Sequence, residues 1–124
     1  MIGYVTLGTN KMDKAAAFYD ALLGDLGGKR VMEADTFIAW STGMGNPAIS
    51  IIKPADGNAA TVGNGVMVAI PVGANEKVDA MHAKALELGG TDEGAPGFRG
   101  DNFYAGYFRD LDGNKLNFFH FGQG

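Results

Sequence analysis

The side chains best suited to acid–base or metal chemistry are few in this sequence. Cysteine is absent, and the histidines are His82 and His120. A disulfide framework, a cysteine nucleophile and a cysteine-held metal are therefore excluded. His82 falls within a predicted helix, at the border of its buried face. His120 follows Asn117 by three residues in a predicted strand, and this odd spacing directs the two side chains to opposite sheet faces. Two histidines that both face helices do not make a metal site.

The carboxylates offer little more chemistry. Asp110 and Asp112 stand in the segment DLDGN, where Asp-Gly predicts a tight hairpin turn. Their oxygens are expected to accept bonds from nearby backbone N–H groups, and the loop has too few oxygens for calcium. Glu33 and Asp35 flank a predicted hairpin and are expected to be solvated. The sequence has no Ser–His–Asp elbow, phosphate loop or dinucleotide glycine pattern, so it assigns no catalytic residue.

The composition excludes several classes of partner. The chain has 124 residues, of which 46% are apolar and 19% charged, which is typical of a globular domain. Its net charge is −4 and its charges are scattered, so the basic surface that binds nucleic acid is missing. It contains no apolar span of about 20 residues, so no membrane helix is predicted. The first residues are typical of a strand and not of a signal peptide, and the cytoplasm is the expected location.

Predicted strands and helices occur in the same order twice. Short β-branched apolar runs predict strands, and apolar residues at 3.6-residue spacing predict helices. In the first half the elements cover residues 2–7 (strand), 14–23 (helix), 29–32 and 36–41 (hairpin) and 48–53 (strand). In the second half they cover residues 66–72 (strand), 76–88 (helix), 91–93 (short strand), 102–109 (strand) and 115–121 (strand), and residues 94–101 are predicted as a loop.

The two halves keep a nearly constant offset. Phe18 and Met81 lie 63 positions apart, and so do Gly27 and Gly90. We therefore predict a single α+β domain over residues 1–124, built from two βαβββ modules. Module one covers about residues 1–54, a glycine-rich linker about 55–64, and module two about 65–124. The strands are expected to form a curved mixed sheet around a shared cleft, with the helices outside.

Five segments together resemble the glyoxalase/bleomycin-resistance/extradiol-dioxygenase (vicinal oxygen chelate) superfamily. Residues 3–8 (GYVTLG) and 17–24 (AFYDALLG) are similar to its first strand and helix, and residues 78–90 (VDAMHAKALELGG) to its second helix. Residues 92–97 (DEGAPG) resemble the loop that follows. Residues 108–114 (FRDLDGN) resemble the closing turn, with leucine in place of the family's usual proline. The likeness covers nearly the whole chain and is specific for the fold rather than for a reaction.

The resemblance implies a cleft in which the family's enzymes hold a divalent metal on strands of both modules. The expected ligands are a histidine in the first strand, a histidine at the start of the second module and a glutamate in the last strand. At these positions the sequence has Tyr4, Met67 and Asn117. A neutral phenol, a thioether and an amide do not together replace imidazole and carboxylate ligands. We therefore predict no bound metal and no cofactor.

A cleft without a metal is expected to be lined by aromatic and amide groups. Strand alternation places Phe119 on the same face as Asn117. Trp40 in the third strand can belong either to the core or to the cleft. Arg99, in a glycine-flanked loop, can either bind an anionic group or be solvated. The predicted ligand-binding residues are Tyr4, Thr6, Trp40, Met67, Arg99, Tyr104, Tyr107, Asn117 and Phe119.

Three functions remain open at this point. The first is metal-free binding of a small organic or aromatic molecule, in the manner of the bleomycin-resistance proteins. The second is a divalent-metal-dependent lyase or dioxygenase with an atypical site, and the third is a non-catalytic interaction or regulatory module. The first is favoured because aromatic and amide groups suit stacking and hydrogen bonding, whereas no general base or Lewis acid is evident. The family also implies a homodimer, and the expected partner is a small-molecule ligand.

Overall fold

The computed structural model describes residues 1–122, and the chain divides into two compact units. Unit 1 comprises residues 1–62 and unit 2 begins at Gly63. Each unit contains one strand, one helix and then three strands, so the predicted α+β class and the pair of βαβββ modules are confirmed. Residues 53–67, which include the predicted linker, form no helix or strand. No helix in the described part of the chain is long and apolar enough to span a membrane.

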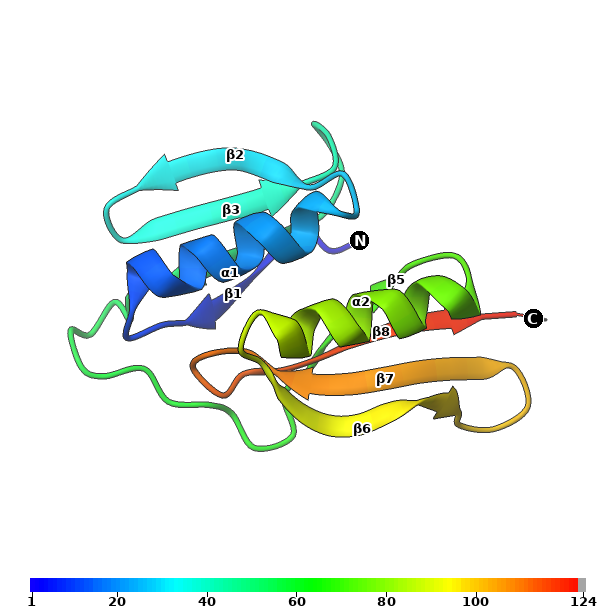
Figure 1. The fold of residues 1–124 in the computed structure, drawn as a ribbon. Helices are drawn as coiled ribbons and strands as arrows, with labels where there is room; N and C mark the ends of the chain where they lie inside the picture. The colour runs from blue at the N-terminus through cyan, green and yellow to red at the C-terminus, as the bar shows by residue number, and fades with distance from the viewer. Residues whose placement is uncertain (123–124) are drawn as a thin grey trace. The chain divides into compact units, whose positions relative to one another are not determined.

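Unit 1 consists of β1 (Tyr4–Gly8), α1 (Met12–Gly24), β2 (Lys29–Ala34), β3 (Phe37–Ser41) and β4 (Ala48–Ile52). Its strands form one sheet in the order β1-β4-β3-β2. The first strand, β1, pairs in parallel with the last strand, β4, and the other neighbours are antiparallel. Helix α1 connects β1 to β2 and packs on one face of this sheet (Figure 1).

Unit 2 consists of β5 (Val68–Pro71), α2 (Asn75–Glu87), β6 (Thr91–Phe98), β7 (Phe103–Arg109) and β8 (Lys115–Phe121). Its sheet has the order β5-β8-β7-β6, which repeats the topology of unit 1. The first strand again pairs in parallel with the last, and α2 packs across β6, β7 and β8. The strand predicted to begin at Val66 begins two residues later, at Val68.

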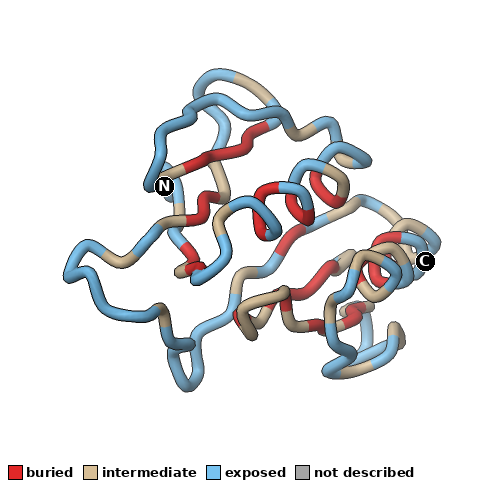
Figure 2. The backbone as a smooth tube through the Cα atoms, turned by 60° about the vertical axis from the view of Figure 1, so that its left-hand side comes forward, coloured by how far each residue is buried: buried red, intermediate tan, exposed pale blue. Residues whose placement is uncertain are grey.

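Each helix is held against its sheet by an apolar stripe whose members recur every three or four residues. On α1 the buried residues are Ala15, Ala16, Phe18, Tyr19, Leu22 and Leu23. On α2 they are Val78, Met81, His82 and Ala85. Beneath α2 the fully buried rings of Phe108 and Phe118 stack with their centroids 5.2 Å apart. Figure 2 shows the buried stretches of each unit along its helix and its strands.

A glycine with a left-handed backbone follows each helix by two or three residues. Gly27 has a φ of +80° and Gly89 a φ of +108°, values that residues with a side chain rarely adopt. The next residue in each case donates its N–H to the carbonyl five residues earlier, which closes the helix as in a Schellman motif. The helices themselves, Met12–Gly24 and Asn75–Glu87, keep the predicted offset of 63 residues. At the glycines the offset is 62, so Gly27 corresponds to Gly89 and not to Gly90.

The prediction of a loop over residues 94–101 is wrong for most of its length. Strand β6 continues to Phe98, and residues along its whole length, from Thr91 to Phe98, pair with β7 at intervals. The register slips between Asp92 and Gly94 and again between Gly94 and Gly97, which marks β-bulges. Glycine is common at bulges because a bulge bends the backbone where a side chain would be crowded. The glycines that suggested a loop therefore permit an irregular strand instead.

The predicted hairpin turn between β7 and β8 is confirmed. Oδ1 of Asp110 accepts the backbone N–H groups of Asp112 and Asn114, each at 2.9 Å. Oδ2 of Asp110 accepts the side-chain amide of Asn114 at 3.0 Å. Gly113, with a φ of +90°, completes the turn. The Asp110 carboxylate thus stabilises the turn locally, as expected for an aspartate at this position.

Candidate functional site

The sheet of unit 2 has one face covered by α2 and one face turned away from it. Leu116 and Phe118 are fully buried on the α2 side. Because side chains alternate along a strand, Lys115, Asn117 and Phe119 lie on the other side of β8. The positions paired with them on β5 and β7 extend this surface. We define the distal face of unit 2 by Ala69, Pro71, Phe103, Ala105, Tyr107, Arg109, Lys115, Asn117, Phe119 and Phe121.

Asn117 occupies the middle of the distal face. Ala69 and Tyr107 lie beside it on the neighbouring strands, and Lys115 and Phe119 lie before and after it on β8. Asn117 has a relative exposure of 0%, and neither its Nδ2 nor its Oδ1 has a hydrogen-bond partner among the described residues. A buried amide in this condition destabilises a fold by about 1–3 kcal/mol unless a group from outside the chain bonds to it.

Two cationic side chains lie close to the ring of Tyr107. The guanidinium carbon of Arg99 and the Nζ of Lys115 each lie 5.4 Å from the ring centroid. Such a cation is attracted by the negative face of the aromatic ring. Nη2 of Arg99 also donates a 2.7 Å hydrogen bond to the carbonyl of Ala95. Arg99 therefore reaches the distal face, although its backbone lies just beyond the end of β6.

Two glycines of β6 leave room for the Arg99 guanidinium. A Cβ at Gly94 would lie 3.3 Å from Nη2, and a Cβ at Gly97 would lie 3.1 Å from Nη1. These glycines pair with Tyr107 and Ala105, two positions of the distal face. Both glycines fall in the segment predicted as a loop, so their role in positioning the arginine was not predicted.

The part of the distal face near the start of β7 is aromatic. The rings of Phe103 and Phe119 stack with centroids 5.4 Å apart, and Phe121 lies 6.0 Å from Phe103. Phe103 was not among the predicted ligand residues, although its even spacing from Tyr107 on one strand places the two side chains on the same face. Along β8 the distal face thus changes from a cationic side chain at Lys115, through a buried amide, to an aromatic surface.

Tyr104 lies on the α2 side of the sheet and not on the distal face. Its hydroxyl donates a 2.6 Å hydrogen bond to Oδ1 of Asp79 on α2, and its ring packs edge-on against Phe98 at 5.0 Å. The hydrogen bond to the Asp79 carboxylate raises the pKa of the Tyr104 hydroxyl. Tyr104 and Tyr107 were both predicted to line one cleft, but the structure places them on opposite faces of β7.

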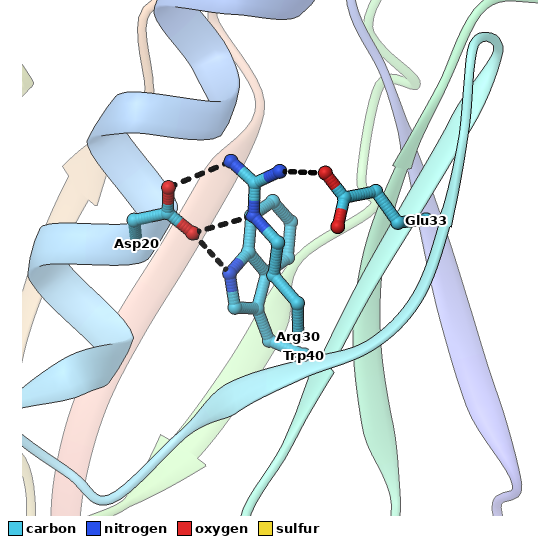
Figure 3. Close-up of polar contacts among 4 residues, drawn as sticks. All are labelled: Asp20, Arg30, Glu33 and Trp40. Carbon is cyan, nitrogen blue, oxygen red and sulfur yellow. Dashed lines mark hydrogen bonds and ion pairs between the residues drawn. The ribbon is translucent and has the colours of Figure 1, made fainter.

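Trp40 lies in the core of unit 1, with 2% of its surface exposed. Its indole Nε1 donates a 2.8 Å hydrogen bond to Oδ1 of Asp20 on α1. Asp20 also accepts hydrogen bonds from Nε and Nη2 of Arg30, at 2.9 and 2.7 Å (Figure 3). Nη1 of Arg30 donates to Glu33 at 2.6 Å. Of the two positions that the sequence left open for Trp40, the structure shows the core.

The remaining predicted ligand residues lie in unit 1 and before β5. Tyr4 and Thr6 alternate with the buried Leu7 and therefore face away from α1. Tyr4 is 64% exposed, and its ring packs edge-on against Phe37 at 6.1 Å. Met67 immediately precedes β5 and is 39% exposed. The predicted residues that gather at the distal face of unit 2 are Arg99, Tyr107, Asn117 and Phe119.

His82 joins the secondary-structure elements of unit 2. It is 4% exposed, and its Nε2 lies 3.0 Å from the carbonyl of Tyr107 and 3.2 Å from Oδ1 of Asp92. Because both partners accept hydrogen bonds, Nε2 carries a proton and ties α2 to β6 and β7. The His82 ring and Pro96 also close over Gly106, where a Cβ would lie 3.0 Å from each. His82 is therefore a packed histidine, in keeping with its predicted place at the border of the buried face of the helix.

The donors at the family's metal positions do not suit a divalent metal. Asn117 offers a neutral amide, Met67 a thioether and Tyr4 a phenol, where the resemblance implies carboxylate and imidazole ligands. His120 pairs across the sheet with Tyr104 and lies, like it, on the α2 side. Within residues 1–122, no group of three or more histidine, aspartate or glutamate side chains is arranged to hold a metal ion.

Comparison with known proteins gives the family. The sequence profile of the Glyoxalase/Bleomycin resistance protein/Dioxygenase superfamily matches residues 1–118. The chain belongs to this superfamily. A glyoxalase/bleomycin resistance protein from Albidiferax ferrireducens T118 is 36% identical to this superfamily member, with 97% of this chain and 98% of that chain covered and a TM-score of 0.88. The family predicted from the sequence is thus confirmed, while a search of curated proteins finds no match.

Other solved structures extend the likeness without selecting a reaction. The hypothetical protein SA1046 from S. aureus is 27% identical, over 97% of this chain and 92% of that chain, with a TM-score of 0.76. A lactoylglutathione lyase from Agrobacterium tumefaciens is 18% identical, over 97% and 92% of the two chains, with a TM-score of 0.73. At that identity the lyase shares the fold, and its activity does not transfer to this superfamily member.

Proposed function

We propose that this superfamily member binds a small organic molecule on the distal face of unit 2 and has lost the family's usual metal ligands. The observation that carries the proposal is the buried Asn117 amide, which has no hydrogen-bond partner among the described residues. An amide can donate and accept hydrogen bonds at once, but it does not titrate and it binds divalent metals weakly. A polar group of a small molecule would satisfy it.

The surroundings of Asn117 support a ligand with an apolar part. Tyr107 lies beside the amide on β7 and Phe119 follows it on β8, and aromatic rings suit stacking against flat or apolar molecules. A few polar groups among apolar walls are typical of small-molecule sites. Tyr4, Thr6 and Met67 stay predicted ligand residues.

Replacing Asn117 with leucine is expected to abolish ligand binding and to leave the fold intact. Leucine is similar in size and has no polar group to leave unsatisfied, so the melting temperature without ligand should be unchanged or higher. A thermal-shift screen of small aromatic and amphipathic molecules would identify ligands that stabilise the parent protein. Calorimetric titration of those ligands should show binding to the Asn117→Leu variant at least about tenfold weaker.

The matched control is Asn58→Leu, the same change at an exposed position outside both sheets, which should bind as the parent does. Equal ligand binding by Asn117→Leu would reject the proposal. Elemental analysis would favour a metal-dependent lyase or dioxygenase instead if it found about one Zn, Ni, Mn or Fe ion per chain and if EDTA removed that ion with a loss of stability. A metal-free, folded protein that no molecule of the screen stabilises would favour the interaction or regulatory module.

The proposal includes a homodimer, which the family implies. Large apolar side chains remain exposed on both units, among them Met32 at 58% and Phe121 at 70%. Contact between two copies would remove such surfaces from water. Light scattering at micromolar concentrations should give twice the 13.0 kDa mass of one chain. The mass of a single chain at every concentration would reject the homodimer.

A further inference from the structure

The polarity of the distal face of unit 2 bears on the chemistry of its ligand. We propose that the ligand is an amphipathic organic anion. Its negative group binds Arg99 and Lys115 beside the Asn117 amide, and its apolar body lies on Phe103 and Phe119. This inference rests on the proposed function, because it concerns the same surface, and it adds the charge and the polarity of the bound molecule.

The first support is the unbalanced positive charge. Among the described residues, no carboxylate forms an ion pair with Arg99 or Lys115. Arg109 on the same face differs, because it pairs with Glu93 and also donates to the carbonyl of Gly113. Arg99 and Lys115 therefore give this face uncompensated positive charge, although the chain as a whole carries a net charge of −4. Such a positive region raises the local concentration of anions.

The second support is that Arg99 is held in place before any ligand arrives. Its guanidinium is fixed by the bond to the Ala95 carbonyl, by the Tyr107 ring and by the space over Gly94 and Gly97. A guanidinium has five N–H donors in a rigid fork, and one bond to a carbonyl leaves donors for a carboxylate. Because the side chain is already ordered, binding an anion would lose little conformational entropy.

The third support is the spacing along β8. Lys115, Asn117 and Phe119 are alternate residues on one face, and a strand rises about 3.3 Å per residue. About 13 Å therefore separates Lys115 from Phe119, with the amide halfway between them. A carboxylate near Lys115 would accept a hydrogen bond from Nδ2 of Asn117, which gives this buried donor a partner. The body of the same molecule would then reach the stacked rings of Phe103 and Phe119.

The test compares three probes that separate charge from apolar body. Calorimetric titration of the full chain with 4-phenylbutyrate should show binding at least about tenfold tighter than with neutral 4-phenylbutan-1-ol or with acetate. Binding of 4-phenylbutyrate should also weaken as salt is added, because the attraction is between charges. The Arg99→Gln/Lys115→Gln double variant should lose about tenfold in affinity for 4-phenylbutyrate and keep the parent's affinity for the alcohol.

A matched double variant controls for net charge. Lys11→Gln/Lys14→Gln removes the same charge from exposed positions of unit 1 and should bind 4-phenylbutyrate as the parent does. Circular dichroism and melting temperature would establish that both double variants are folded. Unchanged 4-phenylbutyrate binding by a folded Arg99→Gln/Lys115→Gln variant would overturn the inference, and so would the absence of any binding of this acid to the parent.

Failure of the inference can be told apart from failure of the proposed function. If the alcohol binds as tightly as the acid and Asn117→Leu abolishes both, the distal face is the site but its ligand is not selected by charge. If the acid binds parent and Asn117→Leu equally, the amide is not part of the site and the proposed function fails with the inference. If the acid binds more tightly than the alcohol, and if this binding requires Asn117 as well as Arg99 and Lys115, the result supports both the proposed function and the inference.

Discussion

Replacing Trp40 with alanine is expected to lower the free energy of unfolding by about 3–5 kcal/mol. The side chain is 2% exposed, and its ring lies 5.6 Å from that of Tyr19 on α1 and 5.9 Å from the guanidinium carbon of Arg30. Alanine would remove these contacts and leave a cavity between α1 and the sheet. Urea unfolding should be followed by circular dichroism, because Trp40 is the sole tryptophan of the sequence.

Trp40→Phe is the control for this prediction. Phenylalanine keeps an aromatic ring but lacks the indole N–H. The free energy of unfolding of Trp40→Phe should therefore lie between those of the parent and Trp40→Ala. It should also keep the parent's affinity for ligands, because the Trp40 indole faces α1. A Trp40→Ala variant within about 1 kcal/mol of the parent would contradict the core role, since core truncations of this size cost several times more.

The Asp20→Ala variant is expected to lose about 1–3 kcal/mol, because the buried Trp40 N–H would lose its acceptor. Asp20→Asn keeps a side-chain oxygen that can accept this bond and should lose less. The Asp20→Asn substitution removes the ion pair with Arg30. The side chains of this pair are 31% exposed at Arg30 and 44% exposed at Asp20. Exposed pairs of this kind contribute below about 1 kcal/mol. Equal losses in the two variants would show that the indole bond is unimportant.

The same pair of residues predicts a dependence on pH. The hydrogen bond from Arg30 is the largest cause that lowers the pKa of Asp20 in the folded protein, and the bond from Trp40 lowers it further. Ionised Asp20 therefore stabilises the fold above its unfolded pKa of about 3.9. This contribution is lost as the pH falls through the lower, folded pKa. Urea unfolding should show Asp20→Asn less stable than the parent at neutral pH, and the difference should shrink as the pH falls below about 4, towards the folded pKa of Asp20. A constant difference would contradict the assignment.

Periodicity explains which parts of the fold and site could be predicted from the sequence. A strand alternates every two residues whatever surrounds it, so Asn117 and Phe119 could be placed on one face, with Leu116 and Phe118 beneath α2. The offset between the two helices could be read because each helix buries one stripe of apolar residues. The same alternation separates Tyr104 from Tyr107, since the two tyrosines are three positions apart and an odd spacing places them on opposite faces. Grouping those two tyrosines was therefore an error that strand geometry alone could have prevented.

Other features depend on contacts that no local pattern encodes. The extent of the irregular strand β6 is set by its pairing with β7, which is interrupted by two bulges. The glycine content of this segment is typical of a loop, so the strand could not be recognised from it. Arg99 reaches Tyr107 because Gly94 and Gly97 lack side chains on the path of its guanidinium. That path depends on a side-chain conformation and on the register of a partner strand. The placement of Trp40 against Asp20 likewise required the packing of α1 on its sheet.

The pairing of the first strand with the last in each unit has a consequence for synthesis on the ribosome. β5 ends at Pro71, and its neighbour in the sheet, β8, begins at Lys115. At about 5–20 residues per second, a nascent chain waits several seconds between these two strands. α2 and the β6–β7 hairpin can form from local contacts in that interval, but β5 has to remain unpaired. A chain arrested before β8 would have an open sheet edge and would lack Asn117. The same strand therefore completes the sheet of unit 2 and supplies the candidate ligand residue.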